Sequence, residues 1–225
     1  MVAQSTHVTS RAVLALRQVG DHPEPVHRGV RWLLAESGAG APWWVRAART
    51  AMRIHASGSD GAGWPWFPGS AAWVVPTSLA ICAMARHRQG PHAGPIATRV
   101  QQAAQFLLSR RCPDHGWNHG GLFAPGERPA SYPETTGVAL LALGAMRLAE
   151  APSDLESSIR RGEHHARQPM STEGASWLRL GLLAHGRSVA PAPSDCSDWT
   201  VSQIALRAIA ECATRGHNPF MGTAR

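Results

Sequence analysis

The sequence contains no lysine, although its 225 residues carry 22 basic and 15 acidic side chains and a formal net charge of +7. All of this basic charge therefore lies on arginine, which suits phosphate recognition. The arginines never form a run longer than two residues, and aromatic residues do not alternate with them as a base-stacking groove would need. We therefore attribute the lack of lysine to compositional bias and expect no nucleic-acid partner.

Long apolar runs and paired cysteines are also missing. No stretch approaches the roughly 20 apolar residues of a membrane span, and no basic segment followed by an apolar one opens the chain. Four scattered cysteines without a Cys-x-x-Cys motif are typical of reduced thiols. We expect a cytoplasmic protein with no transmembrane segment. Its length and 44% apolar content indicate a globular protein of either one repeat-built domain or two ordinary ones.

What the chain does contain is a repeat at the start of its apolar segments. "TSRAVLAL" begins at Thr9, "TSLAICAM" at Thr77, "TGVALLAL" at Thr136 and the weaker "SQIALRAI" at Ser202. Two alanines three residues apart form a smooth stripe on which another helix can approach closely. The leading Thr or Ser is predicted to cap the first helical turn. Each copy therefore predicts a capped helix that packs tightly.

A second amphipathic segment follows each of the first three copies. These segments are "PEPVHRGVRWLLAE", "GPIATRVQQAAQFLLSRR" and "APSDLESSIRRGEHHARQ", and two further helices are predicted at "APWWVRAARTAMRIHA" and "TEGASWLRLGLLAHG". The count is about nine helices, and no segment alternates as a strand would. The sequence therefore predicts an all-α fold of helical hairpins.

Two related Gly/Pro-rich stretches connect the hairpins. "DGAGWPWFPGSAAWVVPT" runs from Asp60 to Thr77, and "DHGWNHGGLFAPGERPASYPETT" runs from Asp114 to Thr136. Each begins with an acidic turn, reaches Gly-Trp and ends at the threonine that opens a repeat. Elaborate connections of this kind are typical of repeat proteins built from supersecondary units.

The segment "FLLSRRCPDHGWNHG", followed by a Gly/Pro loop and "YPETTGVALLALGA", resembles the repeats of squalene and hopene cyclases, class II terpene cyclases and protein prenyltransferase β subunits. The resemblance covers roughly residues 8–212 and is strongest over 57–145. It implies a single (α/α)-toroid domain over residues 1–225, in which an inner ring of helices surrounds an apolar cavity for an isoprenoid and an outer ring encloses both. The helices that follow Thr9, Thr77, Thr136 and Ser202 would be the inner ones.

The chain departs from that family in length and in its turns. Arg111 occupies the position of the family's turn glutamine, and His115 replaces a glycine. A toroid of six hairpins needs about twelve helices, more than we predict here. The ring would therefore be an open arc, or a second subunit would complete it.

The catalytic motifs of these families are absent. No Asp-x-Asp-Asp or Asp-Asp-x-x-Asp run occurs, and the prenyltransferase zinc set Asp-x-Cys…His is approached only by Asp195, Cys196 and His217, in the wrong spacing. We predict no cofactor. The carboxylates that lie in the connecting stretches, and are therefore the candidate catalytic groups, are Asp60, Asp114 and Glu134.

Aromatic residues gather in the same two stretches. The chain has nine Trp against four Phe and one Tyr, and the candidate ligand-binding residues are Trp64, Trp66, Phe67, Trp73 and Trp117. Such rings can line a cavity and stabilise a carbocation. They can equally fill the gaps between packed hairpins, and their setting in turns favours this second interpretation.

The leading functional hypothesis is a divergent toroid protein that binds an isoprenoid or other lipid-like ligand. If the protein is an enzyme, the resemblance implies a terpene cyclase or a prenyltransferase-like activity. One alternative is a non-catalytic helical-repeat module whose concave face takes a protein or peptide. Another is a zinc-dependent prenyl transfer that uses Asp195, Cys196 and a histidine.

Overall fold

The computed structural model describes residues 4–20, 22–39, 61–87, 92–120, 129–146, 155–189 and 200–221. In these ranges the chain forms helices and two isolated β-bridges, but no strand, so the predicted all-α fold is confirmed. The helices are α1 (Thr6–Val19), α2 (Pro23–Ala35), α4 (Val74–Met84), α5 (Ala93–Ser109), α6 (Pro133–Ala145), α7 (Leu155–Ala166), α8 (Thr172–Leu183) and α9 (Val201–Thr214). The helix predicted over residues 41–56 lies outside the described ranges. None of the described helices is long and apolar enough to cross a membrane.

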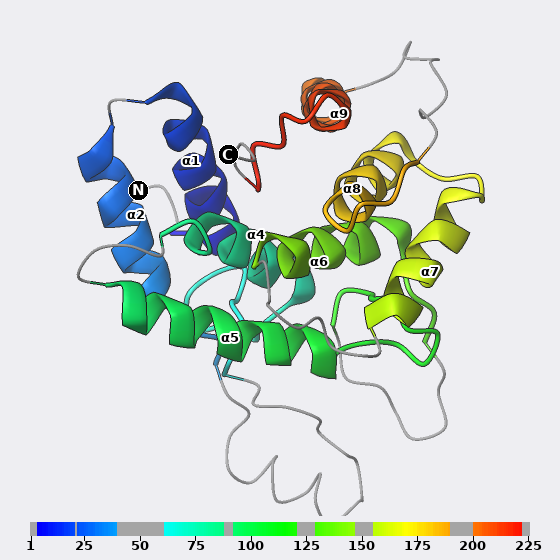
Figure 1. Ribbon diagram of the computed structural model, residues 1–225. Helices are drawn as coiled ribbons and strands as arrows, with labels where there is room; N and C mark the ends of the chain where they lie inside the picture. Colours follow the sequence, from blue (N-terminus) through cyan, green and yellow to red (C-terminus); the bar gives the residue numbers. More distant parts are fainter. Residues whose placement is uncertain are drawn as a thin grey trace, which may run out of the picture.

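Apart from α9, which packs on α8, the described helices form a first layer of α1, α4, α6 and α8 and a second layer of α2, α5 and α7 (Figure 1). In the first layer α1 packs on α4, α4 on α6 and α6 on α8, while α2, α5 and α7 each pack on the helix that precedes them in the chain. The first-layer helices run parallel. Arg17 and His87 meet at the C-terminal ends of α1 and α4, and Gly174 near the start of α8 lies against Pro133 at the start of α6. Equivalent ends of these helices therefore lie on the same side of the molecule.

Burial follows the sequence pattern of each layer. Nearly every residue of α4 and α6 is buried, because each of these apolar helices has neighbours on several sides. The second-layer helices bury only a stripe, such as Val26, Val30 and Leu33 of α2. The predicted pairing of an apolar helix with an amphipathic one therefore describes the α4–α5 and α6–α7 hairpins well.

Glycines bring α6 and α8 closest together. A Cβ atom on Gly137 would overlap the backbone of Trp177, and one on Gly181 would overlap the carbonyl oxygen of Gly137. A Cβ on Gly144 would lie 2.7 Å from that of Ala184. The two backbones therefore touch along their length, which the alanines of the repeat alone would not allow.

Helix α9, which contains the repeat at Ser202, does not lie beside α6. The place beside α6 is taken by α8, and α9 packs on α8 instead. The physical reason is the number of packing faces. Helix α9 buries only Leu206, Ala210 and Ala213 and leaves Val201 and Ile204 exposed, whereas α8 buries seven of its twelve residues.

The predicted helix caps are also wrong. The N-cap residues of α1, α4, α6 and α9 are Ser5, Trp73, Tyr132 and Thr200, not the Thr or Ser of the repeat. At α9 the side chain of Thr200 accepts a hydrogen bond from Gln203 N in a capping box. Thr77 and Thr136 lie one turn inside their helices, where their hydroxyls bind the preceding loop.

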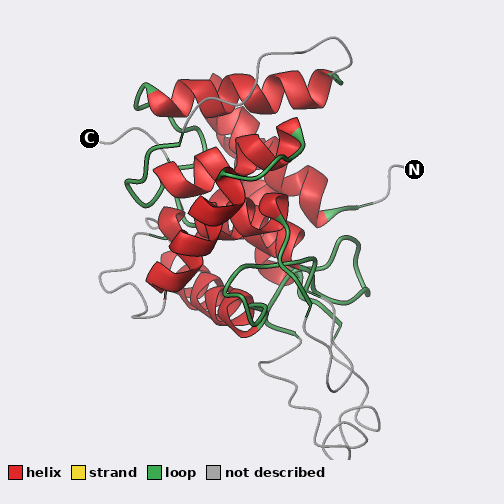
Figure 2. Ribbon diagram, turned by 90° about the vertical axis from the view of Figure 1, so that its right-hand side faces the viewer, coloured by secondary structure: helices red, strands yellow, loops and turns green. Residues whose placement is uncertain are grey.

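The two Gly/Pro-rich connecting stretches lie together at the N-terminal end of the first layer (Figure 2). We call the one before α4 the first loop and the one before α6 the second loop. Val74 N at the start of α4 donates to His119 O of the second loop at 3.1 Å, and Tyr132 N at the start of α6 donates to Trp117 O at 2.8 Å. The loops therefore form one connected surface across the helix starts.

The chain after α9 returns to the first layer. We call residues 217–221 the C-terminal segment, and we call the side of the first layer turned away from α2, α5 and α7 the inner face. Figure 1 shows this segment between α1 and α8 on the inner face. Pro219 O accepts hydrogen bonds from Gln18 of α1 at 3.1 Å and from Arg86 beyond α4 at 2.7 Å. The segment therefore bridges the two sides of the layer.

The contact between α6 and α8 can be tested with Gly181→Ala. In an ordinary helix this change stabilises by roughly 0.5–1 kcal/mol, but here the new methyl group meets the backbone of Gly137. We expect the free energy of unfolding to fall by about 1–3 kcal/mol, measured by urea denaturation. The matched control is Gly94→Ala in α5, where the added Cβ meets nothing within 4 Å. Equal effects of the two substitutions would contradict the close approach.

Candidate functional site

Trp64 joins the first hairpin to α4. Its indole Nε1 donates to Leu33 O in the last turn of α2 at 2.8 Å, and its backbone N donates to Thr77 Oγ1 of α4 at 2.8 Å. The side chain is 0% exposed. Because the last carbonyl groups of a helix lack partners within the helix, the indole satisfies one of them while the threonine holds the loop.

Trp117 repeats this arrangement one hairpin later. Its Nε1 donates to Leu107 O near the end of α5 at 2.6 Å, its backbone N donates to Thr136 Oγ1 of α6 at 3.0 Å, and its side chain is also 0% exposed. We call each set of a tryptophan, its carbonyl partner and its threonine a clasp. Neither indole is accessible to a ligand, so the clasp explains these two tryptophans as scaffold residues.

At each clasp, an arginine of the next second-layer helix contacts the tryptophan or its loop. Arg99 of α5 stacks on Trp64 with its guanidinium carbon 3.6 Å from the ring centroid. Its Nη2 donates to Glu36 O and Gly63 O, each at 3.1 Å, and its Nη1 donates to Ala62 O. Burial lowers the pKa of Arg99 to about 10, which leaves it charged at neutral pH. The stacking is therefore a cation–π contact that also closes the loop backbone.

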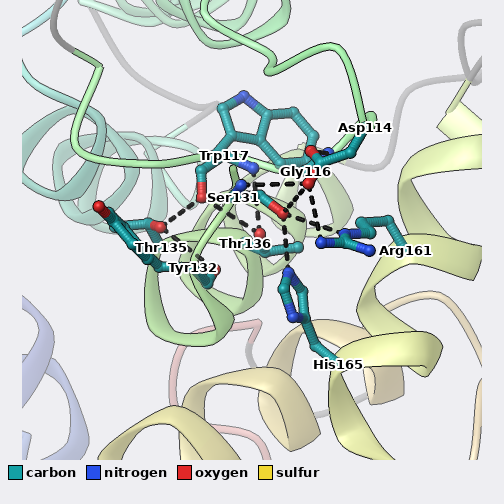
Figure 3. A network of polar contacts seen from close by, with 9 residues as sticks. All are labelled: Asp114, Gly116, Trp117, Ser131, Tyr132, Thr135, Thr136, Arg161 and His165. Atoms are coloured by element: carbon teal, nitrogen blue, oxygen red, sulfur yellow. Dashed lines mark hydrogen bonds and ion pairs between the residues drawn. The ribbon is translucent and has the colours of Figure 1, made fainter. Parts of the chain in front are cut away.

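At the second clasp the corresponding contact is an ionic network around Asp114 (Figure 3). Asp114 Oδ2 accepts from Ser131 N at 3.1 Å and from Ser131 Oγ at 3.0 Å, and it pairs with Arg161 Nη2 at 2.8 Å. Its Oδ1 accepts from Gly116 N at 3.2 Å. The network therefore ties α7, through Arg161, to both ends of the second loop.

This environment keeps Asp114 ionised. Burial by itself raises the pKa of the carboxyl, but the hydrogen bonds from Ser131 and Gly116 and the charge of Arg161 hold that pKa below its usual value. Protonation of an alkene or epoxide requires a carboxylic acid that carries its proton. Asp114 is thus in a structural role and in the wrong protonation state to act as such an acid.

Ser131 and His165 lie in the same network but do not form a nucleophile–base pair. Ser131 Oγ is 2.8 Å from His165 Nε2 and accepts from Arg161 Nε at 3.1 Å. Because the single hydroxyl proton goes to Asp114, His165 Nε2 must carry its own proton and donate it to Ser131. Ser131 is only 5% exposed, and a Cβ on Gly116 would overlap its Oγ. No room remains there for a reacting carbonyl.

Cys112 beside this network is not a thiolate nucleophile. Burial, together with the charge of Asp114, raises the pKa of the Cys112 thiol to about 11. The thiol therefore stays protonated at neutral pH.

Of the other two candidate carboxylates, the structure describes only Glu134. Asp60 lies outside the described residues. Glu134 occupies the first turn of α6, and its side-chain oxygen lies beside Gly174 at the start of α8. An acidic side chain at two helix N-termini interacts favourably with their partial positive charge, so this position suits a structural role.

The aromatic candidates divide by accessibility. Trp66 and Trp73 are half-buried, and Phe67 is 52% exposed. The ring of Trp66 lies 5.0 Å from that of His7 in α1, whose pKa is lowered to about 4 mainly by burial and also by the charge of Arg11. Trp66, Phe67 and Trp73 therefore keep surface that a ligand could contact.

Of the three candidate zinc ligands, the structure describes only His217. Asp195 and Cys196 lie outside the described residues, and His217 is exposed at the start of the C-terminal segment. In the part of the chain that the structure describes, no group of three or more His, Cys, Asp or Glu residues could hold a metal ion.

The sequence did not predict two features of the structure. One is the contact of Arg99 and Arg161 with the loops of the clasps, and the other is the packing of the C-terminal segment on the inner face. A signal existed for Arg99, because it lies three residues after Ile96 and so close to the buried stripe of α5. A charged residue in that place indicates a buried partner. No local pattern indicated where residues 217–221 would pack.

The two clasps can be tested by replacing their threonines with valine, which keeps the shape and removes the hydroxyl. Thr77→Val and Thr136→Val each leave a buried backbone N–H of tryptophan without an acceptor. We expect each change to lower the free energy of unfolding by about 1–3 kcal/mol, measured by denaturant titration. Thr214→Val, at an exposed threonine of α9, is the control. Clasp variants no less stable than this control would refute the structural role.

A pH dependence follows from the buried histidines. Burial is the main cause that lowers the pKa values of His7 and His87 to about 4, against 6.5 in the unfolded chain. Between pH 6.5 and 4 the unfolded state therefore binds more protons, and stability falls as the pH falls through this window. We expect the melting temperature to drop between pH 7 and pH 5 and His7→Gln to flatten that drop. An unchanged slope in this variant would contradict the burial of His7.

No family model matches the chain, and the search of curated proteins also finds no match.

Proposed function

We propose that this protein binds an isoprenoid or other lipid-like molecule on the inner face of its first helical layer. The supporting observation is that an apolar side chain already lies there. Phe220 is 8% exposed and its ring centroid is 5.6 Å from that of Trp177 in α8. The surface between α1 and α8 therefore suits an apolar group, as the resemblance to isoprenoid-binding toroids leads us to expect.

The loop end of the first layer adds aromatic surface to this site. The ring of Trp66 is tilted against that of His7 in α1. Burial lowers the pKa of Arg11 in α1, and the negative charge of Glu173 in α8 opposes this lowering. The starts of α1 and α8 are thus close enough for their charges to interact across the inner face. The half-buried ring of Trp66 is available to a ligand at this end.

The proposal is for binding and not for catalysis. The Asp114 network is saturated with internal partners, and Ser131 has no space for a substrate. Cyclisation would need a protonated acid, and Asp114, the candidate carboxylate of the described loops, is ion-paired with Arg161.

The test is a melting-temperature screen with farnesol, geranylgeraniol, a neutral polyprene and the diphosphates of farnesol, geranylgeraniol and undecaprenol. A ligand at about 100 times its Kd stabilises the folded state by about 2.7 kcal/mol, which raises the melting temperature by several degrees. Trp66→Ala should reduce this shift, while Ile204→Ala, at an exposed apolar residue of α9, should leave it intact. Failure of every compound to shift the wild-type protein would refute the proposal.

A peptide-binding module is the second candidate, because the group that occupies the inner face is itself a peptide. Its carbonyl at Pro219 accepts two hydrogen bonds from the first layer. Co-purification of a stoichiometric protein partner, with no lipid shift in the screen, would favour this alternative. The zinc hypothesis is removed if the purified protein carries less than about a tenth of an equivalent of zinc.

A further inference from the structure

The C-terminal segment offers two chemically different groups to the inner face. One is the carbonyl oxygen of Pro219, which accepts from Gln18 Nε2 at 3.1 Å and from Arg86 Nη1 at 2.7 Å. The other is the phenyl ring of Phe220, which packs against Trp177. Together they present an oxygen acceptor next to an apolar body.

The segment holds this shape through its own hydrogen bonds. Asn218 Oδ1 accepts from Phe220 N at 3.0 Å, and Asn218 O accepts from Met221 N at 3.1 Å. Gly216 precedes the turn with a φ of 86°, a conformation that glycine adopts freely. A compact turn that follows a glycine joint can leave the surface as a unit without unfolding α9.

In the described part of the chain the segment is anchored over only five residues, whereas α8 meets α6 along its whole length. Two donors bind the Pro219 carbonyl, and Phe220 and Met221 pack against the hydrophobic core. Arg86 is a cation whose hydrogen-bond partner is this neutral carbonyl, and burial lowers its pKa. A ligand oxygen could replace Pro219 O at no loss to Arg86.

We propose that the C-terminal segment is a displaceable occupant that imitates the ligand, so that the ligand is an apolar chain with an oxygen acceptor at one end. The oxygen takes the place of Pro219 O between Gln18 and Arg86, and the apolar chain takes the place of Phe220 against Trp177. The ligand and the segment then exclude each other. This inference rests on the function proposed above and adds the class of ligand and its competitor.

The test uses the full chain and two matched compounds, farnesol and the hydrocarbon farnesene. Phe220→Ala weakens the segment and should tighten farnesol binding by about tenfold, because a larger fraction of the protein is free to bind. Ile204→Ala is the control. Farnesol should bind more tightly than farnesene, and Arg86→Met should reduce this difference by removing a donor. Binding is measured by isothermal titration calorimetry.

The outcomes separate the two proposals. If the wild-type protein binds farnesol and Phe220→Ala binds it no better, the competition is wrong and the binding function stands. If farnesol and farnesene bind equally, the role of Gln18 and Arg86 is wrong. If neither protein binds either compound, the binding function itself fails, and the ligand class fails with it.

A second measurement needs no variant and so does not depend on the folding of Phe220→Ala. Trypsin can cut after Arg215, directly before the joint at Gly216. Saturating farnesol should speed this cleavage in the wild-type protein, relative to cleavage after Arg28 of α2, because it releases the segment. Slower cleavage after Arg215 would show that the ligand holds the segment in place and would overturn the competition.

Discussion

The buried indole N–H of a tryptophan is the constraint on which the arrangement of hairpins depends. A buried N–H must find an acceptor, and in both clasps it finds a carbonyl near the end of a second-layer helix. The same residue binds a threonine of the next first-layer helix through its backbone. One side chain therefore sets the position of a new hairpin relative to the end of the last one.

The clasps also determine how the first-layer helices that form the inner face are aligned. Because the clasps fix where α4 and α6 begin, these helices run side by side with their starts together, and glycines then allow α8 to follow at close range. The loops, the arginine contacts and the Asp114 network all serve this alignment. The chemistry of the loops is thus used for structure, and the inner face is where the proposed ligand would bind.

The sequence predicted the features that depend on local pattern. The helix spans around Thr77, Ile96 and Thr136 and the joint-like role of the Gly/Pro stretches followed from periodicity and turn residues. The hydroxyls of Thr77 and Thr136 were misassigned because a threonine near a helix start can bind either its own first turn or a neighbouring loop, and only the fold decides. The place of α8 beside α6 depends on the backbone contact at Gly137, which pairs residues about forty positions apart. The contact of Pro219 with Gln18 spans 201 positions and has no local signal at all.

Photoaffinity labelling tests the central claim most directly. A farnesol analogue that carries a diazirine on its chain is irradiated with the wild-type protein, and the labelled peptides are identified by mass spectrometry. The account predicts labels on α1, α8 and the loop that contains Trp66, with labelling reduced by excess farnesol. Labels confined to the outward surfaces of α2, α5 and α7 would contradict it.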